Sequence, residues 1–116
     1  MVNVAAVVVT FNRLDKLKTV ISSLEAQTLR PSHLIIINNA STDGTDKYLA
    51  SLESTLDVEI VTMKKNSGGA GGFAEGMSRG YKAGADHVWI MDDDCYPSPT
   101  ALENLVRGFD ESVAEL

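Results

Sequence analysis

Four short, mainly apolar runs alternate along the chain with longer stretches in which apolar positions recur every three or four residues. The first two runs contain no polar residue, which is typical of buried strands, and the third includes Glu59 and Thr62. All four runs are rich in Val or Ile. They occupy residues 4–9, 34–37, 58–63 and 88–91. The other stretches have the spacing of amphipathic helices. Their stripes are Leu14, Leu17, Ile21 and Leu24; Leu49, Leu52 and Leu56; Phe73, Met77 and Tyr81; and Leu102, Leu105, Val106 and Phe109.

The pattern predicts the order β-α-β-α-β-α-β-α and an α/β domain with a parallel sheet of about four strands and helices on both faces. In such sheets a ligand binds beyond the carboxyl ends of the strands. Segments of unusual composition follow all four predicted strands, at residues 10–13, 38–43, 66–72 and 92–96. Because these segments meet at one rim of the sheet, we expect the functional site there.

Capping residues predict where two of the helices begin. Asn12 occupies an N-cap position, with Asp15 three residues later as a weak capping box. Before the last helix, Ser98 followed by proline is one candidate start. Thr100 with Glu103 is a competing start two residues later. The last apolar stripe runs to the end of the chain with no stop signal, so we expect a truncated domain.

The glycine-rich segment 66–72 is predicted to form a loop ahead of the third helix. Residues 69–74 match the dinucleotide-binding pattern G-x-G-x-x-A, but that pattern belongs after the first strand, where this chain has no glycine. A nicotinamide or flavin site is therefore a poor fit. Two interpretations remain, a loop that brings backbone close to a ligand and a purely structural glycine turn.

Three consecutive acids, Asp92, Asp93 and Asp94, follow the fourth apolar run. Side chains two apart on an extended chain share a face, so Asp92 and Asp94 are expected to point together while Asp93 turns aside. Crowded carboxylates are unfavourable unless a cation relieves them. Oxygen ligands without His or thiolate suit Mg²⁺ or Mn²⁺. A solvated acidic turn is the alternative, but the position at the predicted rim favours a metal site.

Asn38 and Asn39 end the second run and allow two interpretations. They stabilise the turn before the next helix, which Ser41 or Thr42 caps, or one of them contacts a base or ribose. The lone Cys95, His33 and His87 are assigned structural roles. Lys64, Lys65 and Arg79 flank the glycine segment and are expected to be solvated rather than bound to phosphate.

Composition and charge narrow the partners. The 116 residues are 44% hydrophobic and 22% charged, as in ordinary globular domains. Sixteen acids against ten bases give a net charge of −6, which argues against nucleic acid or an anionic membrane as the main partner. The single cysteine excludes an internal disulfide and a multi-cysteine zinc site. No apolar run approaches the ~20 residues of a membrane span, and no signal peptide is visible, so we expect a cytoplasmic location.

The acidic balance also limits how phosphate could bind. A diphosphate would be repelled by the three acids, whereas a divalent cation bridges carboxylate and phosphate. The residues therefore point to metal-dependent nucleotide chemistry. A dehalogenase-type phosphatase fits less well, because its Asp pair belongs on the first strand.

Four motifs occur in a recognisable order. They are Val-Val-Val-Thr-Phe-Asn-Arg at 7–13, Ile-Ile-Asn-Asn-Ala-Ser-Thr-Asp-Gly-Thr at 36–45, Asn-Ser-Gly-Gly-Ala-Gly-Gly at 66–72 and Trp-Ile-Met-Asp-Asp-Asp at 89–94. Together they resemble the nucleotide-sugar-binding half of family 2 glycosyltransferases, which have the Rossmann-like GT-A fold. The glycine segment followed by Asp-Asp-Asp-x-x-Pro is most similar to the galactofuranosyl- and rhamnosyltransferase-like branch.

The resemblance implies inverting transfer of a sugar from a UDP- or dTDP-sugar to a hydroxyl of a glycan or lipid-linked acceptor, in cell-surface or cell-wall polysaccharide synthesis. Mn²⁺ or Mg²⁺ would assist, and the three acids would be the DXD motif. An enzyme of this kind could lie peripherally at the inner face of the plasma membrane.

The resemblance also assigns roles to individual positions. Asp94 would hold the metal together with Asp92, which also approaches the ribose. The substrate-binding candidates are Thr10, Phe11, Asn12, Asn38, Asn66, Gly69, Asp92 and Asp93. The family commonly has Asp where this chain has Asn38, which affects base preference.

The family's general base and acceptor site belong to the second half of the domain. We therefore expect residues 1–116 to be the nucleotide-sugar-binding half of a longer protein, with the base beyond Leu116 and no turnover by this part alone. A non-catalytic nucleotide-binding α/β module is the alternative.

Overall fold

The computed structural model describes residues 2–115, with side chains for residues 2–108. The predicted alternation of strands and helices is confirmed. The elements are β1 (Val4–Thr10), α1 (Leu14–Glu25), β2 (His33–Asn38), α2 (Thr45–Ala50), β3 (Val58–Thr62), α3 (Gly68–Lys82), β4 (His87–Asp92) and α4 (Ala101–Glu115). The side chain of Phe109, the last member of the fourth stripe, lies outside the described residues.

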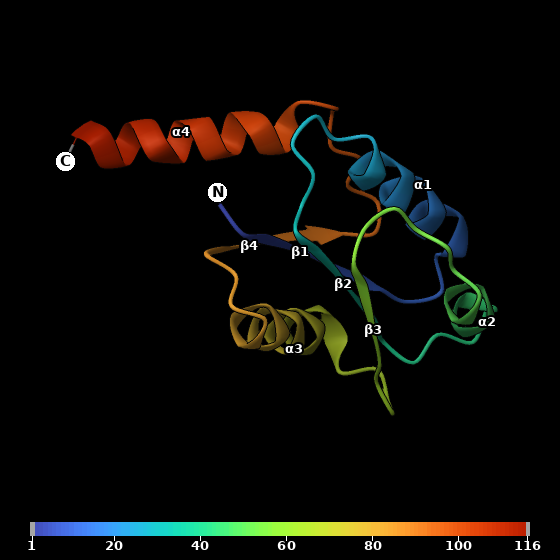
Figure 1. Cartoon of the computed structure of the whole chain (residues 1–116). Coiled ribbons are helices and arrows are strands. Elements are labelled where there is room, and N and C mark those ends of the chain that lie inside the picture. Colours follow the sequence, from blue (N-terminus) through green and yellow to red (C-terminus); the bar gives the residue numbers. More distant parts are fainter. Residues whose placement is uncertain (1, 116) are drawn as a thin grey trace.

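All strands pair in parallel, in the order β3-β2-β1-β4. The order reverses at β1, because β2 continues the sheet on one side of it and β4 on the other. Helices α1 and α2 lie on one face of the sheet and α3 lies on the other, while α4 projects away from the body (Figure 1). The α/β architecture expected from the sequence is therefore correct, and it places the strand-order reversal between β1 and β4.

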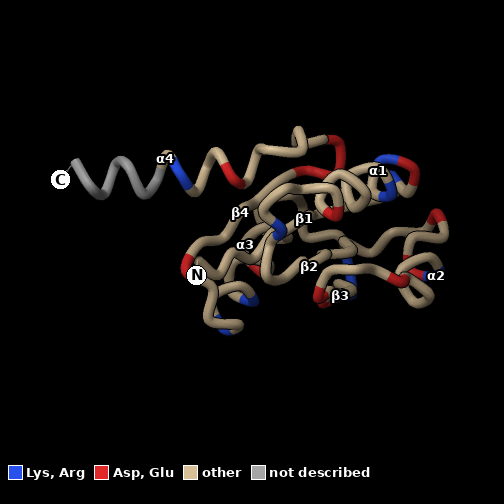
Figure 2. Tube along the Cα trace, turned by 45° about the horizontal axis from the view of Figure 1, so that its top comes forward, with Lys and Arg blue, Asp and Glu red and all other residues tan. Residues whose placement is uncertain are grey.

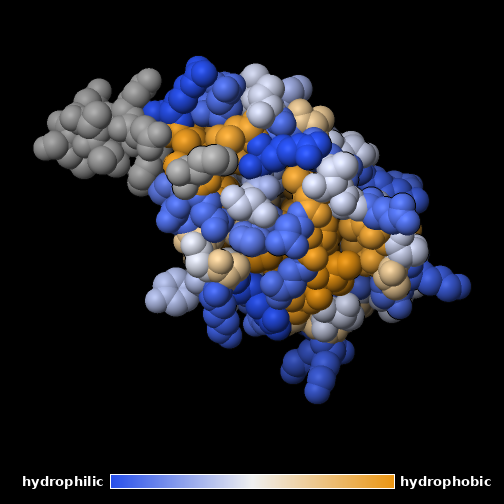
Figure 3. All heavy atoms as spheres, in the orientation of Figure 1, coloured by the Kyte–Doolittle hydropathy of each residue, from blue (hydrophilic) through white to orange (hydrophobic). Residues whose placement is uncertain are grey.

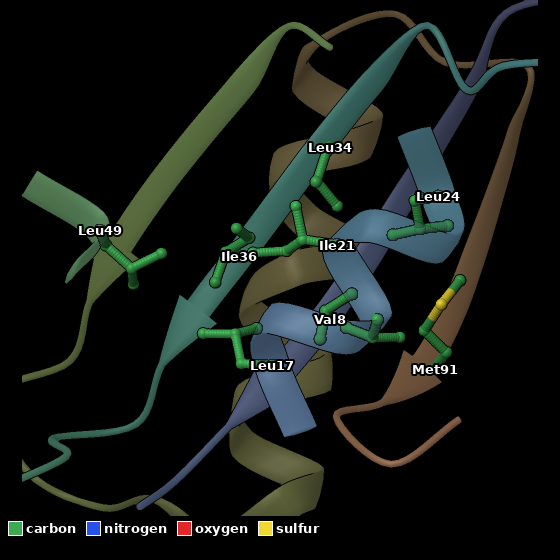
Figure 4. Packing of buried hydrophobic residues seen from close by; sticks show 10 residues of the cluster. Val8, Leu17, Ile21, Leu24, Leu34, Ile36, Leu49 and Met91 are labelled. Carbon is green, nitrogen blue, oxygen red and sulfur yellow. The ribbon is translucent and has the colours of Figure 1, made fainter. Parts of the chain in front are cut away.

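The core has two layers, one on each face of the central strands. On the first face, Leu17, Ile21 and Leu24 of α1 point toward Val8 and Ile36 of the sheet (Figure 4). The second layer consists of Ala5, Val7, Val9, Ile35 and Ile37. Every residue of β1 is buried, and so are all but the first of β2. Removing these side chains from water is the main stabilising contribution to the fold.

The outer strands are less covered than their apolar sequences suggest. Ile60 of β3 is 39% exposed and Ile90 of β4 is 46% exposed, because these strands form the two edges of the sheet. A further apolar surface lies where α4 begins beside β4, and Leu105 is 54% exposed there. Apolar atoms near α4 are visible in Figure 3. The prediction of buried strands therefore holds for β1 and β2 only.

The prediction for the glycine-rich segment was wrong. Residues 68–72 form the first turns of α3 rather than a loop before it. The buried face of this helix consists of Gly72, Gly76 and Gly80, spaced four residues apart. A Cβ atom would lie 2.6 Å from Val9 at Gly72 and 2.2 Å from Val7 at Gly76. The missing side chains let α3 lie directly on the sheet.

The apolar stripe that predicted α3 does not face the core. Met77 is 50% exposed and Tyr81 is 83% exposed, while Phe73 packs only partly against the second layer. The sheet-facing positions of α3 are glycines, so the large side chains lie on other sides of the helix. The spacing indicated the helix correctly but not its buried face.

The helix starts also differ from the capping predictions. Asn12 has a positive φ of 51°, and Arg13 occupies the N-cap position of α1 without a side-chain cap. The Leu14 N–H is satisfied instead by Asp43, whose Oδ2 accepts it at 3.1 Å. The cap is therefore supplied from the loop after β2, a contact that no local motif encodes.

At the other end of the fold, α4 begins directly after Thr100, as the later of the two predicted starts requires. Its Leu102 N–H donates to Oε1 of the buried Gln27 at 3.1 Å. The Gln27 amide in turn donates to the Ser98 carbonyl at 2.7 Å. Gln27 thus fastens the start of α4 to the end of α1. Within the described part of the chain, no helix has the length and apolar character needed to cross a membrane.

Candidate functional site

A hollow of about 360 Å³ lies at the carboxyl edge of the sheet, where β1, β2 and β4 end and α3 begins. This is the edge at which the strand order reverses, and ligands of open α/β sheets bind there. The hollow is lined by Val9, Thr10, Phe11, Arg13, Asn39, Asn66, Gly68, Gly69, Asp92, Asp93 and Asp94. The four segments singled out in the sequence therefore do meet at one rim.

The structure brings most of the predicted site residues together, but not all. Thr10, Phe11, Asn66, Gly69 and the three acids line the hollow, whereas Asn12 and Asn38 do not. Phe11 is the one aromatic residue among the described residues that line the hollow, and it is 42% exposed. An exposed ring at the rim of a polar hollow is suited to stacking on a planar group.

The middle acid of the triplet is part of the framework of the site. Asp93 is only 4% exposed, and its Oδ2 accepts a hydrogen bond from the Thr10 hydroxyl at 3.0 Å. Its Oδ1 lies 3.4 Å from Nη1 of Arg13. Asp93 therefore links the end of β1 to the turn after β4. It does not turn away from Asp94 as predicted, because both carboxylates contact the same nitrogen of Arg13. The prediction assumed an extended chain, but β4 ends at Asp92.

The outer acids, Asp92 and Asp94, are both exposed and both line the hollow. Asp94 Oδ2 lies 3.5 Å from Nη1 of Arg13. Acidic positions along the trace between β4 and α4, near α1, appear red in Figure 2. Within the described residues, no group of three or more His, Cys, Asp or Glu side chains is arranged to hold a metal by itself.

Asn39 is a site residue that the sequence did not single out from its neighbour Asn38. It is 2% exposed, and its Oδ1 accepts the Ser67 N–H at 3.0 Å and the Ser67 hydroxyl at 3.2 Å. Its Nδ2 donates to the Gly68 carbonyl at 3.0 Å. Asn39 thus clamps the start of α3 to the end of β2. The alternation of β2 separates the two, because Asn38 shares a face with Leu34 and Ile36, which α1 covers, whereas the other face carries Ile35 and Ile37 beneath α3.

Asn38 itself is fully buried beside the site rather than in it. Its Oδ1 accepts the Ser41 N–H at 3.1 Å, which stabilises the turn after β2. Its Nδ2 has no hydrogen-bond partner among the described residues. A buried amide donor without a partner is costly.

Asn12 joins two loops of the rim. Its Oδ1 accepts the Thr42 N–H at 2.6 Å, and its own N–H donates to the Ser41 hydroxyl at 3.1 Å. It borders a separate surface hollow beside Asp43. The Thr45 hydroxyl holds the pKa of Asp43 below its usual range, helped by the Leu14 N–H and opposed by slight burial. Asn12 and Asp43 therefore fix the loop after β1 against the loop after β2.

The glycine segment contributes backbone to the hollow. Gly68 has a positive φ of 75°, a conformation that glycine adopts at little cost. The Asn66 Oδ1 accepts the Gly68 N–H at 2.8 Å, so the turn into α3 is stabilised locally. Gly68 and Gly69 line the hollow at the amino end of α3, where backbone donors are available to a ligand.

His33, Arg79 and Cys95 are not among the residues that line the hollow. His33 pairs with Asp57 at 3.0 Å near the other end of the sheet. Arg79 pairs with Glu75 and Glu59, both at 3.0 Å. Cys95 is exposed, so the expectation that it packs as a small buried hydrophobe was wrong.

Taken together, the parallel sheet, the reversal at β1 and the hollow at its carboxyl edge define an α/β domain of GT-A fold. The chain belongs to glycosyl transferase family 2, whose family model matches residues 5–115. The family resemblance found in the sequence is thereby confirmed.

Among curated proteins, the chain is similar to two mycobacterial galactofuranosyltransferases. It is 37% identical over 101 residues to galactofuranosyltransferase GlfT1 of Mycolicibacterium smegmatis, covering 85% of this chain and 32% of that protein. It is 39% identical over 92 residues to galactofuranosyltransferase GlfT1 of Mycobacterium tuberculosis, covering 79% and 30%. The chain thus spans about a third of the length of these relatives.

Solved structures confirm the fold. The S. aureus TarS 1-349 complex with UDP-GlcNAc superimposes with a TM-score of 0.78 at 21% identity, covering 94% of this chain and 31% of that one. The mannosyltransferase PcManGT from Pyrobaculum calidifontis, in complex with GDP-Man and Mn²⁺, gives 0.75 at 23% identity, covering 90% and 31%. At these identities the likeness is one of architecture.

Proposed function

We propose that residues 1–116 form the donor-binding half of an inverting glycosyltransferase that takes sugar from a UDP- or dTDP-sugar. The acceptor would be a hydroxyl of a glycan or lipid-linked saccharide in cell-wall synthesis. The observation that carries the proposal is the single hollow in which Phe11, the glycine turn and two exposed acids meet. The galactofuranosyltransferases similar to this chain support a galactofuranosyl-type donor, and a rhamnosyl-type donor is the alternative that the sequence motifs leave open.

The nucleoside would occupy the side of the hollow formed by β1 and α3. Phe11 offers a ring for stacking on the base, and Thr10 lies at its edge, buried and bonded to Asp93. Asn66 and Gly69 offer polar and backbone contacts without bulk. Asn38 would act from behind this rim, by stabilising the turn after β2 through its bond to the Ser41 N–H. Asn12 would act through the loop that it fixes rather than by direct contact.

The residues present fit a divalent cation. Asp92 and Asp94 are exposed oxygen donors on one hollow, with no thiolate or imidazole among its lining residues. Mg²⁺ and Mn²⁺ bind at such sites through one or two carboxylates, with water and phosphate completing the shell, so no third acidic ligand is needed. Asp94 would hold the ion, with Asp92 beside it near the ribose. Such an ion would supply the positive charge that stabilises a departing diphosphate.

The proposed transfer needs two elements that we do not assign to any residue of this chain. One is a carboxylate that removes the proton of the acceptor hydroxyl, and the other is the acceptor site. We propose that both belong to sequence beyond Leu116, in keeping with the third of the relatives' length that this chain spans. The role left to residues 1–116 is to bind and orient the donor.

Calorimetric titration with UDP and with dTDP, each with and without Mn²⁺, tests the proposal. We expect one of the two nucleotides to bind at least tenfold more tightly with the ion present. Asp94→Ala should remove that difference and leave the fold intact, because exposed acids rarely support a core. Asp46→Ala is the matched control, since Asp46 is an exposed acid away from the hollow.

The outcomes separate the two candidate functions. Nucleotide binding that is equally tight with and without Mn²⁺ would contradict the metal-dependent enzyme and favour a non-catalytic nucleotide-binding module. An unchanged response in Asp94→Ala would remove Asp94 from the site even if the ion matters. The absence of binding by both nucleotides would contradict the proposed donor.

A further inference from the structure

Arg13 connects two carboxylates that differ in their surroundings. Its Nη1 lies 3.4 Å from Oδ1 of Asp93 and 3.5 Å from Oδ2 of Asp94. The Asp93 side chain is 6% exposed, whereas the Asp94 side chain is 48% exposed. One guanidinium nitrogen therefore has a sheltered partner and a solvated partner at similar distances.

The sheltered partner is held in place by the framework. The Thr10 hydroxyl donates to the other oxygen of Asp93, so that carboxylate cannot turn without breaking a buried bond. Asp93 therefore anchors Arg13 at the mouth of the hollow. The contact with Asp94 is the weaker one, because exposed ion pairs contribute little and exchange readily with water and ions.

The charge of the lining shows why this contact matters. Among the described residues that line the hollow, Arg13 is the one cation beside three carboxylates. In the absence of other ions, its guanidinium is the group that offsets the charge of Asp94. A divalent ion at Asp94 would meet this positive charge within a few ångströms, where like charges repel strongly.

We propose that Arg13 is a stand-in cation, which neutralises Asp94 until a divalent ion displaces it and so sets the affinity of the site for that ion. The inference rests on the proposed role of Asp94 as metal ligand. Arg13 and the ion compete for one carboxylate, while Asp93 keeps the displaced guanidinium nearby. Arg13 is a positioning residue in this scheme.

Manganese binding without nucleotide tests the competition directly. Free Mn²⁺ is measured by electron paramagnetic resonance as the ion is added to the 116-residue chain and to its variants. We expect Arg13→Gln to bind Mn²⁺ about fivefold more tightly than the unaltered chain, the upper range for loss of an exposed ion pair. The gain should shrink as salt is raised, since exposed charges are screened.

Two controls separate competition from a general change in charge. Arg79→Gln removes the same charge from an arginine that pairs with Glu75 and Glu59, away from the hollow. It should leave Mn²⁺ affinity within about twofold of the unaltered chain, given screening over that distance. Arg13→Lys keeps the positive charge at the site, so we expect no comparable gain in Mn²⁺ affinity. It is the variant to compare with the unaltered chain if Arg13→Gln fails to fold.

Each outcome bears on the inference. Tighter binding by Arg13→Gln alone supports it, and so does binding that appears only in that variant. Equal gains in Arg13→Gln and Arg79→Gln overturn it. Unchanged or weaker Mn²⁺ binding by Arg13→Gln, while the unaltered chain binds Mn²⁺ through Asp94, also overturns it. In that case the proposed function is unaffected. A gain in Arg13→Lys equal to that in Arg13→Gln also overturns it. If no variant binds Mn²⁺ without nucleotide, the inference about Arg13 fails, while the proposed function is still decided by the titrations with UDP and dTDP.

Discussion

Gly76→Ala tests the close packing of α3 on the sheet, which gives the site its shape. An added Cβ would lie 2.2 Å from Cγ1 of Val7 and 3.3 Å from its Cβ. Carbon atoms in contact are normally about 3.5–4.0 Å apart. Val7 is fully buried on the central strand, and its branched side chain has little rotamer freedom. The conflict can be relieved only by moving helix and strand apart.

The magnitude follows from two opposing effects. Overpacking of a well-filled core costs about 1–3 kcal/mol, and the depth of this overlap favours the upper end. Replacing glycine by alanine inside a helix gains about 1 kcal/mol. We therefore expect Gly76→Ala to lower the free energy of unfolding by about 2 kcal/mol, which lowers the melting temperature by roughly 8 °C.

Urea unfolding followed by far-ultraviolet circular dichroism measures this change. Gly108→Ala is the matched control, because nothing lies within 4 Å of a Cβ at that position of α4. It should be neutral or slightly stabilising. Val7→Ala should restore part of the loss when combined with Gly76→Ala, giving a coupling of at least about 1 kcal/mol. If Gly76→Ala is as stable as the unaltered chain, the reasoning about the glycine face is wrong.

Two further predictions concern the loops of the rim. Asn39→Ala removes the hydrogen bonds that hold Ser67 and Gly68, so buried backbone groups at the start of α3 lose their partners. We expect about tenfold weaker nucleotide binding by calorimetry and faster amide hydrogen exchange at the start of α3. Unchanged exchange there would contradict the role of Asn39 as a clamp. Asp43 has a lowered pKa in the fold, so its stabilising contribution is present above the ordinary value of 3.8 and is lost as the pH falls through the folded value. Melting temperatures measured against pH should therefore fall less steeply below pH 3.8 in Asp43→Asn than in the unaltered chain, and parallel curves would refute this.

The order of elements could be predicted from the sequence because each strand is a short, mainly apolar run that is followed by a stretch with helical spacing. The buried face of α3 could not be predicted, because a hydrophobic pattern is read from large apolar side chains and glycine has none. Gly72 and Gly76 face the sheet for a steric reason that appears only when Val9 and Val7 are placed opposite them. The glycines at residues 68–72, which begin α3, were mistaken for part of a loop for the same reason.

The candidate site could be predicted in outline from the rule that strand ends of a parallel sheet gather at one edge. The roles of neighbouring residues were harder to separate. Asn38 and Asn39 are alike in sequence, yet one is buried on the core face and the other clamps α3. The cap of α1 by Asp43 spans 29 positions, so no local motif could reveal it.

The sheltered position of Asp93 between two solvated acids has an evolutionary consequence. A screen for well-expressed variants should retain the middle aspartate, whose loss would leave the Thr10 hydroxyl without its acceptor, and should let its two neighbours drift. Selection for donor capture should hold the neighbours instead. The three consecutive aspartates are therefore subject to two separate selection pressures, one for solubility and yield and one for donor binding.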